Sequence, residues 1–126
     1  MLRVFLFLTC LCLAAIFQPT NSYAQSNEMI KKCHVAKKIL LEGSRENLPE
    51  GVYCIGVFGA YLEVDAIRGQ AAPYCFPGPP NFGQIIAVWL KFMDQFPEHM
   101  DKPPYMSYSV AMAVNFPCEK ENKEKN

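Results

Sequence analysis

Apolar residues recur at steps of three and four in four stretches of the chain, the spacing of one face of an α-helix. This spacing predicts helices over residues 27–42, 52–67, 82–96 and 104–116, the last opening at Pro103 or Pro104. Suitable boundary residues flank them: Gly43 follows the first helix, Asn81 precedes the third and Pro97 follows it. We therefore expect an all-α fold, a small four-helix domain.

The third stretch is the most apolar of the four. Its polar side chains form only a narrow strip (Gln84, Lys91, Gln95 and the adjacent Asp94). Such a helix is either buried on most sides or shares a face with a partner. Because Val88 and Phe92 lie together beside the strip, we expect them to form the interface of a homodimer.

The third and fourth stretches are joined by a short turn that contains proline, which predicts an antiparallel hairpin. Antiparallel packing places Cys75, before the third helix, close to Cys118, after the fourth. Four cysteines outside the leader allow three pairings. The hairpin selects Cys75–Cys118, which leaves Cys33–Cys54, and we expect both disulfides.

The first 24 residues have the organisation of a secretory signal peptide. Arg3 supplies a positive start, residues 4–17 are apolar, and Ser22-Tyr23-Ala24 is a small-x-small cleavage site. The sequence thus divides into a signal peptide (1–24), a helical domain (25–118) and a charged tail (119–126) that we expect to be disordered. Export into an oxidising compartment agrees with an even number of cysteines.

The second predicted helix contains two glycines. Gly56 and Gly59 each lower helix propensity, and together with Ala60 they form a small surface that another helix can approach closely. The segment before this helix, residues 43–51, is polar and contains Pro49, so we expect it to be irregular.

Charge and motif content point away from nucleic acid and from catalysis. Of twelve basic residues, Arg3 leaves with the leader, so eleven remain against twelve acidic ones and no basic stripe is present. Glu63 and Asp65 are two residues apart on a helix and point to different faces. No zinc spacing, nucleophile motif or phosphate loop occurs. We expect no enzyme activity, no metal, no cofactor and no membrane contact after leader cleavage.

Several short motifs, taken in order, resemble the Rap/Tai family of immunity proteins from type VI secretion systems. They are Cys54-Ile55-Gly56, Cys75-x-Pro77, Gln84, Trp89-Leu90-Lys91-Phe92, Phe96-Pro97-Glu98 and Phe116-Pro117-Cys118. Cys33 fits the helix that precedes them. The chain departs from the family pattern in the register of Gly59, Glu63 and Asp65 and in its Pro103-Pro104-Tyr105 opening. The matching positions are scaffold residues.

The resemblance implies a periplasmic, all-helical protein, often dimeric, that occludes the active site of an injected peptidoglycan amidase. The motifs transfer no inhibitory contact. As contact surface we favour the polar turn between the third and fourth helices, formed by Glu98, His99, Asp101 and Lys102. The alternative is a standalone exported helical protein of the cell envelope that binds a small ligand or an assembly partner with the same scaffold.

Overall fold

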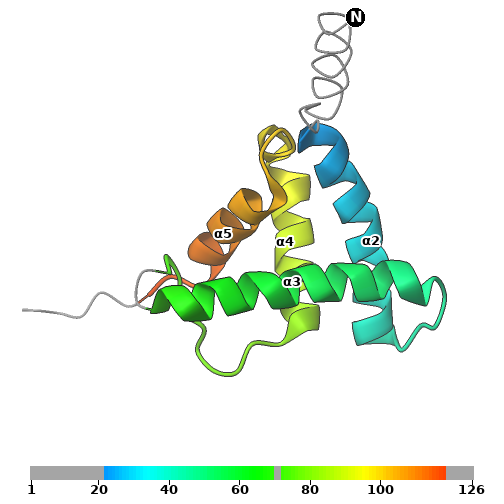
Figure 1. Ribbon diagram of the computed structural model, residues 1–126, viewed down its shortest axis with the longest axis horizontal. Helices are drawn as coiled ribbons and strands as arrows, with labels where there is room; N and C mark the ends of the chain where they lie inside the picture. The colour runs from blue at the N-terminus through cyan, green and yellow to red at the C-terminus, as the bar shows by residue number, and fades with distance from the viewer. Residues whose placement is uncertain (1–21, 70–71, 119–126) are drawn as a thin grey trace, which may run out of the picture.

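The computed structural model describes residues 22–69 and 72–118, and Figure 1 shows them as a group of packed helices. The elements are α2 (Ser22–Glu42), α3 (Leu48–Arg68), α4 (Phe82–Gln95), the short 3-10 helix η2 (Pro97–His99) and α5 (Pro104–Asn115). The described ranges contain no strand. Within these ranges the expected all-α fold of four α-helices is confirmed.

Two helix starts lie earlier than predicted. α2 begins at Ser22, five residues before the expected start, and α3 begins at Leu48, four residues before it. Pro49 lies in the first turn of α3 rather than in an irregular segment. The backbone N–H groups of a first helical turn have no intrahelical acceptor, so a proline, which lacks the N–H, costs no hydrogen bond there. Gly43, directly after the last residue of α2, adopts the expected left-handed conformation with φ 70°.

The predicted signal peptide and tail fall largely outside the part of the chain that is described. Residues 1–21 and 119–126 are not in the described ranges, and the predicted cleavage site at Ser22-Tyr23-Ala24 coincides with the first turn of α2. Among the helices that are described, none combines the length and the apolar character that crossing a bilayer requires.

α4 occupies the middle of the fold. α2 packs on one side of it and α5 on the other, while α3 runs across α2 and α4 (Figure 1). α4 and α5 form the predicted hairpin, joined by η2 and the residues that follow it. The turn of this hairpin therefore lies at one end of α4, and the start of α4 and the end of α5 lie toward the other.

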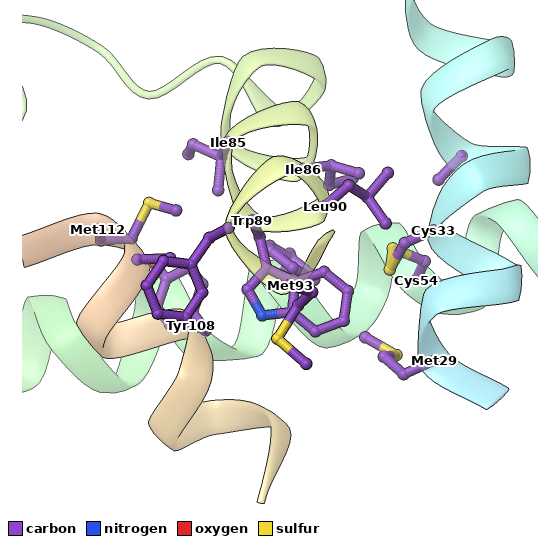
Figure 2. Packing of buried hydrophobic residues seen from close by; sticks show 14 of the residues in the cluster. Met29, Cys33, Cys54, Ile85, Ile86, Trp89, Leu90, Met93, Tyr108 and Met112 are labelled. Atoms are coloured by element: carbon purple, nitrogen blue, oxygen red, sulfur yellow. A yellow bond between two sulfur atoms is a disulfide. The ribbon is translucent and has the colours of Figure 1, made fainter. Parts of the chain in front are cut away.

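Trp89 of α4 is the centre of the core and is fully buried (Figure 2). Its indole Nε1 donates a hydrogen bond to Ser107 Oγ at 3.0 Å, so the polar edge of the ring is satisfied. The ring of Phe58 meets both Trp89 and Tyr108 edge to face at centroid distances of 5.4 Å. Side chains of α3, α4 and α5 thus interlock around one aromatic cluster.

Both predicted disulfides are present. Cys33–Cys54 joins α2 to α3 inside the core, where both residues are fully buried (Figure 2). Cys75–Cys118 joins the α3–α4 connector to the residues after α5 and is exposed to solvent. In the chain-entropy account, closing loops of these lengths stabilises the fold by about 3–4 kcal/mol each.

The glycines that allow close packing are not the ones predicted. A side chain at Gly56 would meet no atom within 4 Å, and one at Gly59 would make only ordinary contact with Phe82. At Gly51, in contrast, a Cβ would clash with the Ile39 side chain and lie 3.3 Å from the backbone of Ala36. The close approach of α2 and α3 therefore depends on Gly51, which the polar character of its neighbours had placed in a loop.

Candidate functional site

The turn predicted to contact a partner is well ordered by backbone hydrogen bonds. His99 N donates to Phe96 O at 3.0 Å, Met100 N to Pro97 O at 3.0 Å and Lys102 N to His99 O at 3.1 Å. At the far side of the turn, Ser26 Oγ of α2 donates to Lys102 O at 3.2 Å. The turn is consequently tied both to itself and to a neighbouring helix.

The four predicted contact residues have different roles within that turn. Glu98, Asp101 and Lys102 are exposed, and Lys102 Nζ lies 3.3 Å from Asp101 Oδ2. His99 is half-buried, with its ring 4.9 Å from that of Phe92 in an edge-to-face contact. Three charged side chains are therefore available to a partner, whereas His99 packs the turn against Phe92 of α4.

The opposite end of the hairpin is held by more than the disulfide. Cys75 N donates to Phe116 O at 2.8 Å, and the rings of Phe76 and Phe116 pack edge to face at 5.0 Å. The connector before α4 is thus fixed to the end of α5 by a covalent bond, a hydrogen bond and an aromatic contact. This bracing leaves the hairpin with one fixed end and one exposed turn.

The reason for expecting a dimer through Val88 and Phe92 does not hold. Phe92 is only 4% exposed, and the other large apolar residues of α4 are covered by α2, α3 and α5. Val88 is half-buried and lines, with Phe92 and Val114, a groove of about 160 Å³ between α4 and α5. The apolar surface left over in the fold lies mainly on α3 and α5 instead.

A polar cluster that the sequence analysis did not identify lies around Asp65 of α3. Asp65 is 6% exposed, whereas Glu63 is exposed, so the two carboxylates do face different ways as predicted. The hydroxyl of Tyr74 donates to Asp65 Oδ2, and that of Tyr105 donates to Asp65 Oδ1 at 2.6 Å. The buried carboxylate therefore has a phenol donor on each oxygen.

Two further groups extend this cluster. Arg68 lies 3.7 Å from Asp65 Oδ1 and donates to the Tyr105 hydroxyl at 2.8 Å. The hydroxyls of Tyr74 and Tyr108 are 2.8 Å apart. Since the one proton of Tyr74 is directed at Asp65, Tyr108 is the donor in this second bond. The chain of bonds links α3, the connector and α5.

Burial and hydrogen bonding to Asp65 raise the pKa values of the phenols in this cluster. Burial, followed by the hydrogen bond to Asp65, raises the pKa of Tyr74 above 10.0. Burial also raises the pKa of Tyr108 to about 12, although the bond to Tyr74 acts in the other direction. The hydrogen bond to Asp65 raises the pKa of Tyr105. At neutral pH these groups are donors, and they serve to position the connector.

A hollow of about 420 Å³ opens beside the cluster, between α3 and the connector. Its walls are mostly apolar, and Asp65 and Glu63 lie along one edge; the apolar lining residues are Leu62, Ala66, Ala72, Tyr74, Phe76 and Pro80. Its size is within the range of small-molecule sites. In the part of the chain that is described, no group of three or more His, Cys, Asp and Glu residues is arranged to hold a metal ion.

One sequence signal could have revealed the Asp65 cluster. Cys54, Phe58 and Asp65 follow helical spacing and fall on the same buried face of α3, so an acid interrupts an otherwise apolar stripe. A buried carboxylate needs donors. The sequence could not identify them, because Tyr74 and Tyr105 come from segments whose position depends on the whole fold.

Comparison of the chain with models of protein families, with curated proteins and with solved structures finds no match.

Proposed function

We propose that this protein is a periplasmic immunity protein, which binds a peptidoglycan amidase delivered by type VI secretion and occludes its active site. The observation that carries the proposal is the junction at Cys75–Cys118. Two motifs of the family resemblance, Cys75-x-Pro77 and Phe116-Pro117-Cys118, are distant in the sequence, with Cys75 and Phe116 41 residues apart. In the fold they are in contact, because Cys75 N donates a hydrogen bond to Phe116 O. The motifs thus act together as one brace of the hairpin.

The braced hairpin suits inhibition by insertion into a cleft. A flexible inhibitory segment loses binding energy when it becomes ordered, and a preorganised one does not. The turn after α4 is fixed by its own hydrogen bonds and by Ser26, and it presents Glu98, Asp101 and Lys102 to solvent. We assign the contact with the amidase to these three side chains, with His99 holding the turn against Phe92.

The test combines the purified exported form of the protein with amidases encoded beside it and measures cleavage of peptidoglycan peptides. Wild-type protein is expected to stop cleavage. The triple variant with Glu98, Asp101 and Lys102 changed to alanine is expected to inhibit at least about tenfold more weakly, as charged contacts at an interface do when truncated. Replacing His99 as well removes its contact with Phe92 and so also loosens the turn. The quadruple variant therefore tests two effects together and is measured separately.

A matched control lies on the other side of the molecule. Lys38, Glu42 and Glu46 are exposed and carry the same net charge as the triple set, so their replacement by alanine should leave inhibition unchanged. Equal inhibition by the triple variant and wild type would move the contact surface elsewhere. Failure of wild-type protein to bind any neighbouring amidase would contradict the immunity function itself.

The hollow beside Asp65 favours a second candidate function, a standalone envelope protein that binds a small apolar ligand. The apolar lining and the volume of about 420 Å³ are its basis. The neutral fluorescent probe N-phenyl-1-naphthylamine tests it: binding should be saturable and should be lost when Ala66→Trp fills the hollow. Val114→Trp, at a 63% exposed site on α5, is the control. Absence of saturable binding would remove this candidate.

A further inference from the structure

The hollow of about 420 Å³ between α3 and the connector has a charge as well as a shape. Among the described residues that line it, two are acidic and none is basic. The acidic residues are Glu63 and Asp65 of α3, and the opposite wall includes the aromatic side chains of Tyr74 and Phe76. The hollow therefore combines apolar walls, aromatic rings and negative charge.

The two acidic residues are not equivalent. The oxygens of Asp65 accept hydrogen bonds from the hydroxyls of Tyr74 and Tyr105, and Arg68 lies 3.7 Å from its Oδ1. The charge of Asp65 is therefore compensated within the fold. Glu63 is exposed and forms no ion pair with another described residue. Its carboxylate is consequently the charge that a ligand in the hollow would meet.

Arg68, the basic residue that follows Glu63 on α3, is directed elsewhere. Its guanidinium donates to the Tyr105 hydroxyl at 2.8 Å and lies beside Asp65. Glu63 and Arg68 are five residues apart, which separates them by about 140° around the helix. An anionic ligand would thus meet the carboxylate of Glu63 and no cation in the described lining.

The aromatic wall suits a cation with an apolar body. The hydroxyl of Tyr74 is occupied by its bonds to Asp65 and Tyr108, so this residue offers its ring to a ligand. The ring of Phe76 lies 5.1 Å from that of Tyr74, at an interplanar angle of 62°. Aromatic rings pack against apolar groups and attract cations at their faces. The wall opposite Glu63 can therefore contact both parts of such a ligand.

The connector is held in place without a ligand. The Cys75–Cys118 disulfide and the hydrogen bond from Cys75 N to Phe116 O fix its middle to the end of α5. The hydroxyl of Tyr74 fixes it to α3. A ligand therefore enters a formed site and does not have to order the connector.

We propose that the hollow binds an organic cation, an amine with an aromatic or alkyl body. Its charge lies against Glu63, and its body lies between α3 and the rings of Tyr74 and Phe76. The proposal rests on the second candidate function, which it narrows from a small apolar ligand to a cationic one. It does not depend on the amidase function.

The first test uses three probes that share one ring system and differ in charge. They are 1-naphthylmethylamine, which is cationic at neutral pH, the neutral 1-naphthylmethanol and the anionic 1-naphthylacetate. Equilibrium dialysis measures the binding of each to the protein without its predicted leader (residues 1–24), at neutral pH and low salt. The amine should bind about tenfold more tightly than the alcohol, through the carboxylate and the rings together. The acetate should bind most weakly.

The second test changes the charge of the site. Glu63→Gln keeps the size of the side chain, so it should weaken binding of the amine to the level of the alcohol and leave the alcohol unchanged. Glu63→Lys should reverse the order and favour the acetate. Glu50→Gln is the matched control, because Glu50 is exposed on the same helix about 20 Å away. Circular dichroism should be the same for all these proteins.

The outcomes distinguish the proposal from the second candidate function. Equal binding of the three probes, or an amine preference that Glu63→Gln leaves intact, would overturn the cationic ligand and leave a site for apolar molecules. Absence of saturable binding by all three probes would overturn both. Amine binding that persists when Ala66→Trp fills the hollow would place the cation elsewhere on the protein and would also overturn the proposal.

Discussion

α3 and α4 are both rich in apolar residues, yet the fold treats them in opposite ways. α4 lies between α2 and α5 and buries six of its large apolar side chains: Ile85, Ile86, Trp89, Leu90, Phe92 and Met93. α3 crosses the outside of the bundle, buries Cys54 and Phe58, and leaves Ile67 87% exposed. The number of helices packed against a helix, rather than its apolar content, therefore decides which helix keeps apolar side chains exposed to solvent.

This difference assigns separate roles to the two helices. α4 is the rigid support for the turn at residues 97–102, because it is held from several sides and ends where that turn begins. α3 forms one wall of the hollow beside Asp65 and leaves apolar side chains exposed. Variants in the two helices are best compared by unfolding measurements on dilute protein with its disulfides intact, so that association of copies does not contribute to the measured stability.

The largest expected effect is at Trp89 of α4. Trp89→Ala leaves a cavity in the core and removes the donor to Ser107 Oγ, so the free energy of unfolding should fall by about 3–5 kcal/mol. Ile67→Ala on α3 should change it by less than about 0.5 kcal/mol, as substitutions at exposed positions do. Guanidinium denaturation measures both. Similar losses for the two variants would contradict the distinction between the helices.

A smaller loss is expected where α3 is fixed to the connector. Tyr74→Phe removes the hydroxyl that donates to Asp65 and accepts from Tyr108, leaving two buried groups short of a partner. The free energy of unfolding should fall by about 1–3 kcal/mol. Tyr53→Phe removes a hydroxyl from a residue that is 53% exposed and is the control, with no expected loss. An unchanged midpoint for Tyr74→Phe would mean that the Asp65 cluster does not stabilise the fold.

Two glycines of α3 should respond with opposite signs. Gly51→Ala forces Ile39 and the backbone of Ala36 to move and should destabilise the protein by about 1–3 kcal/mol. Gly56→Ala meets no neighbour and should stabilise it by about 0.5–1 kcal/mol through helix propensity. Thermal unfolding compares the pair directly. Equal shifts of the two melting temperatures would show that the α2–α3 contact does not depend on Gly51.

The smallest effect is expected in alkaline solution. Burial raises the folded-state pKa of Tyr61 and Tyr108 to about 12, above the value of 10.0 for an unburied phenol. Their contribution to stability is therefore complete below pH 10.0 and is lost as the pH rises toward 12. Denaturation midpoints at intervals between pH 8 and pH 11 should be level at first and then fall, in the range set by ordinary phenol ionisation near pH 10. Loss of stability already at pH 8 to 9 would point to a different group.

Local sequence patterns were sufficient for the helices and the disulfides. Steps of three and four located the four α-helices of the described residues, and the hairpin of α4 and α5 selected the pairing Cys75–Cys118. Helix starts were less accurate, because Pro49 breaks a helix in its interior but is compatible with its first turn. Whether Pro49 lies inside a helix or in its first turn depends on where the helix begins, and the sequence around it does not fix that residue.

Sites that depend on packing could not be predicted. The burial of Phe92 could not be predicted, because α2, α3 and α5 pack on α4 and helix order in a sequence does not state which helix lies at the centre. Nothing in the sequence shows that Gly51 lies against α2 and that Gly56 has no neighbour within 4 Å, because this difference depends on how α2 packs on α3. Asp65 and its donors come from segments that meet only in the folded chain. The exposed turn of Glu98, Asp101 and Lys102 was predictable because it is local.

The central claim is that a braced hairpin turn inhibits a cell-wall amidase. The most direct measurement is a titration of the protein without its predicted leader (residues 1–24) into a fixed amount of an amidase encoded beside it, following release of peptidoglycan peptides. The account predicts that cleavage falls to zero at a fixed stoichiometric ratio, and that the triple variant of Glu98, Asp101 and Lys102 requires a clear excess. Undiminished cleavage at a large excess of wild-type protein would contradict it.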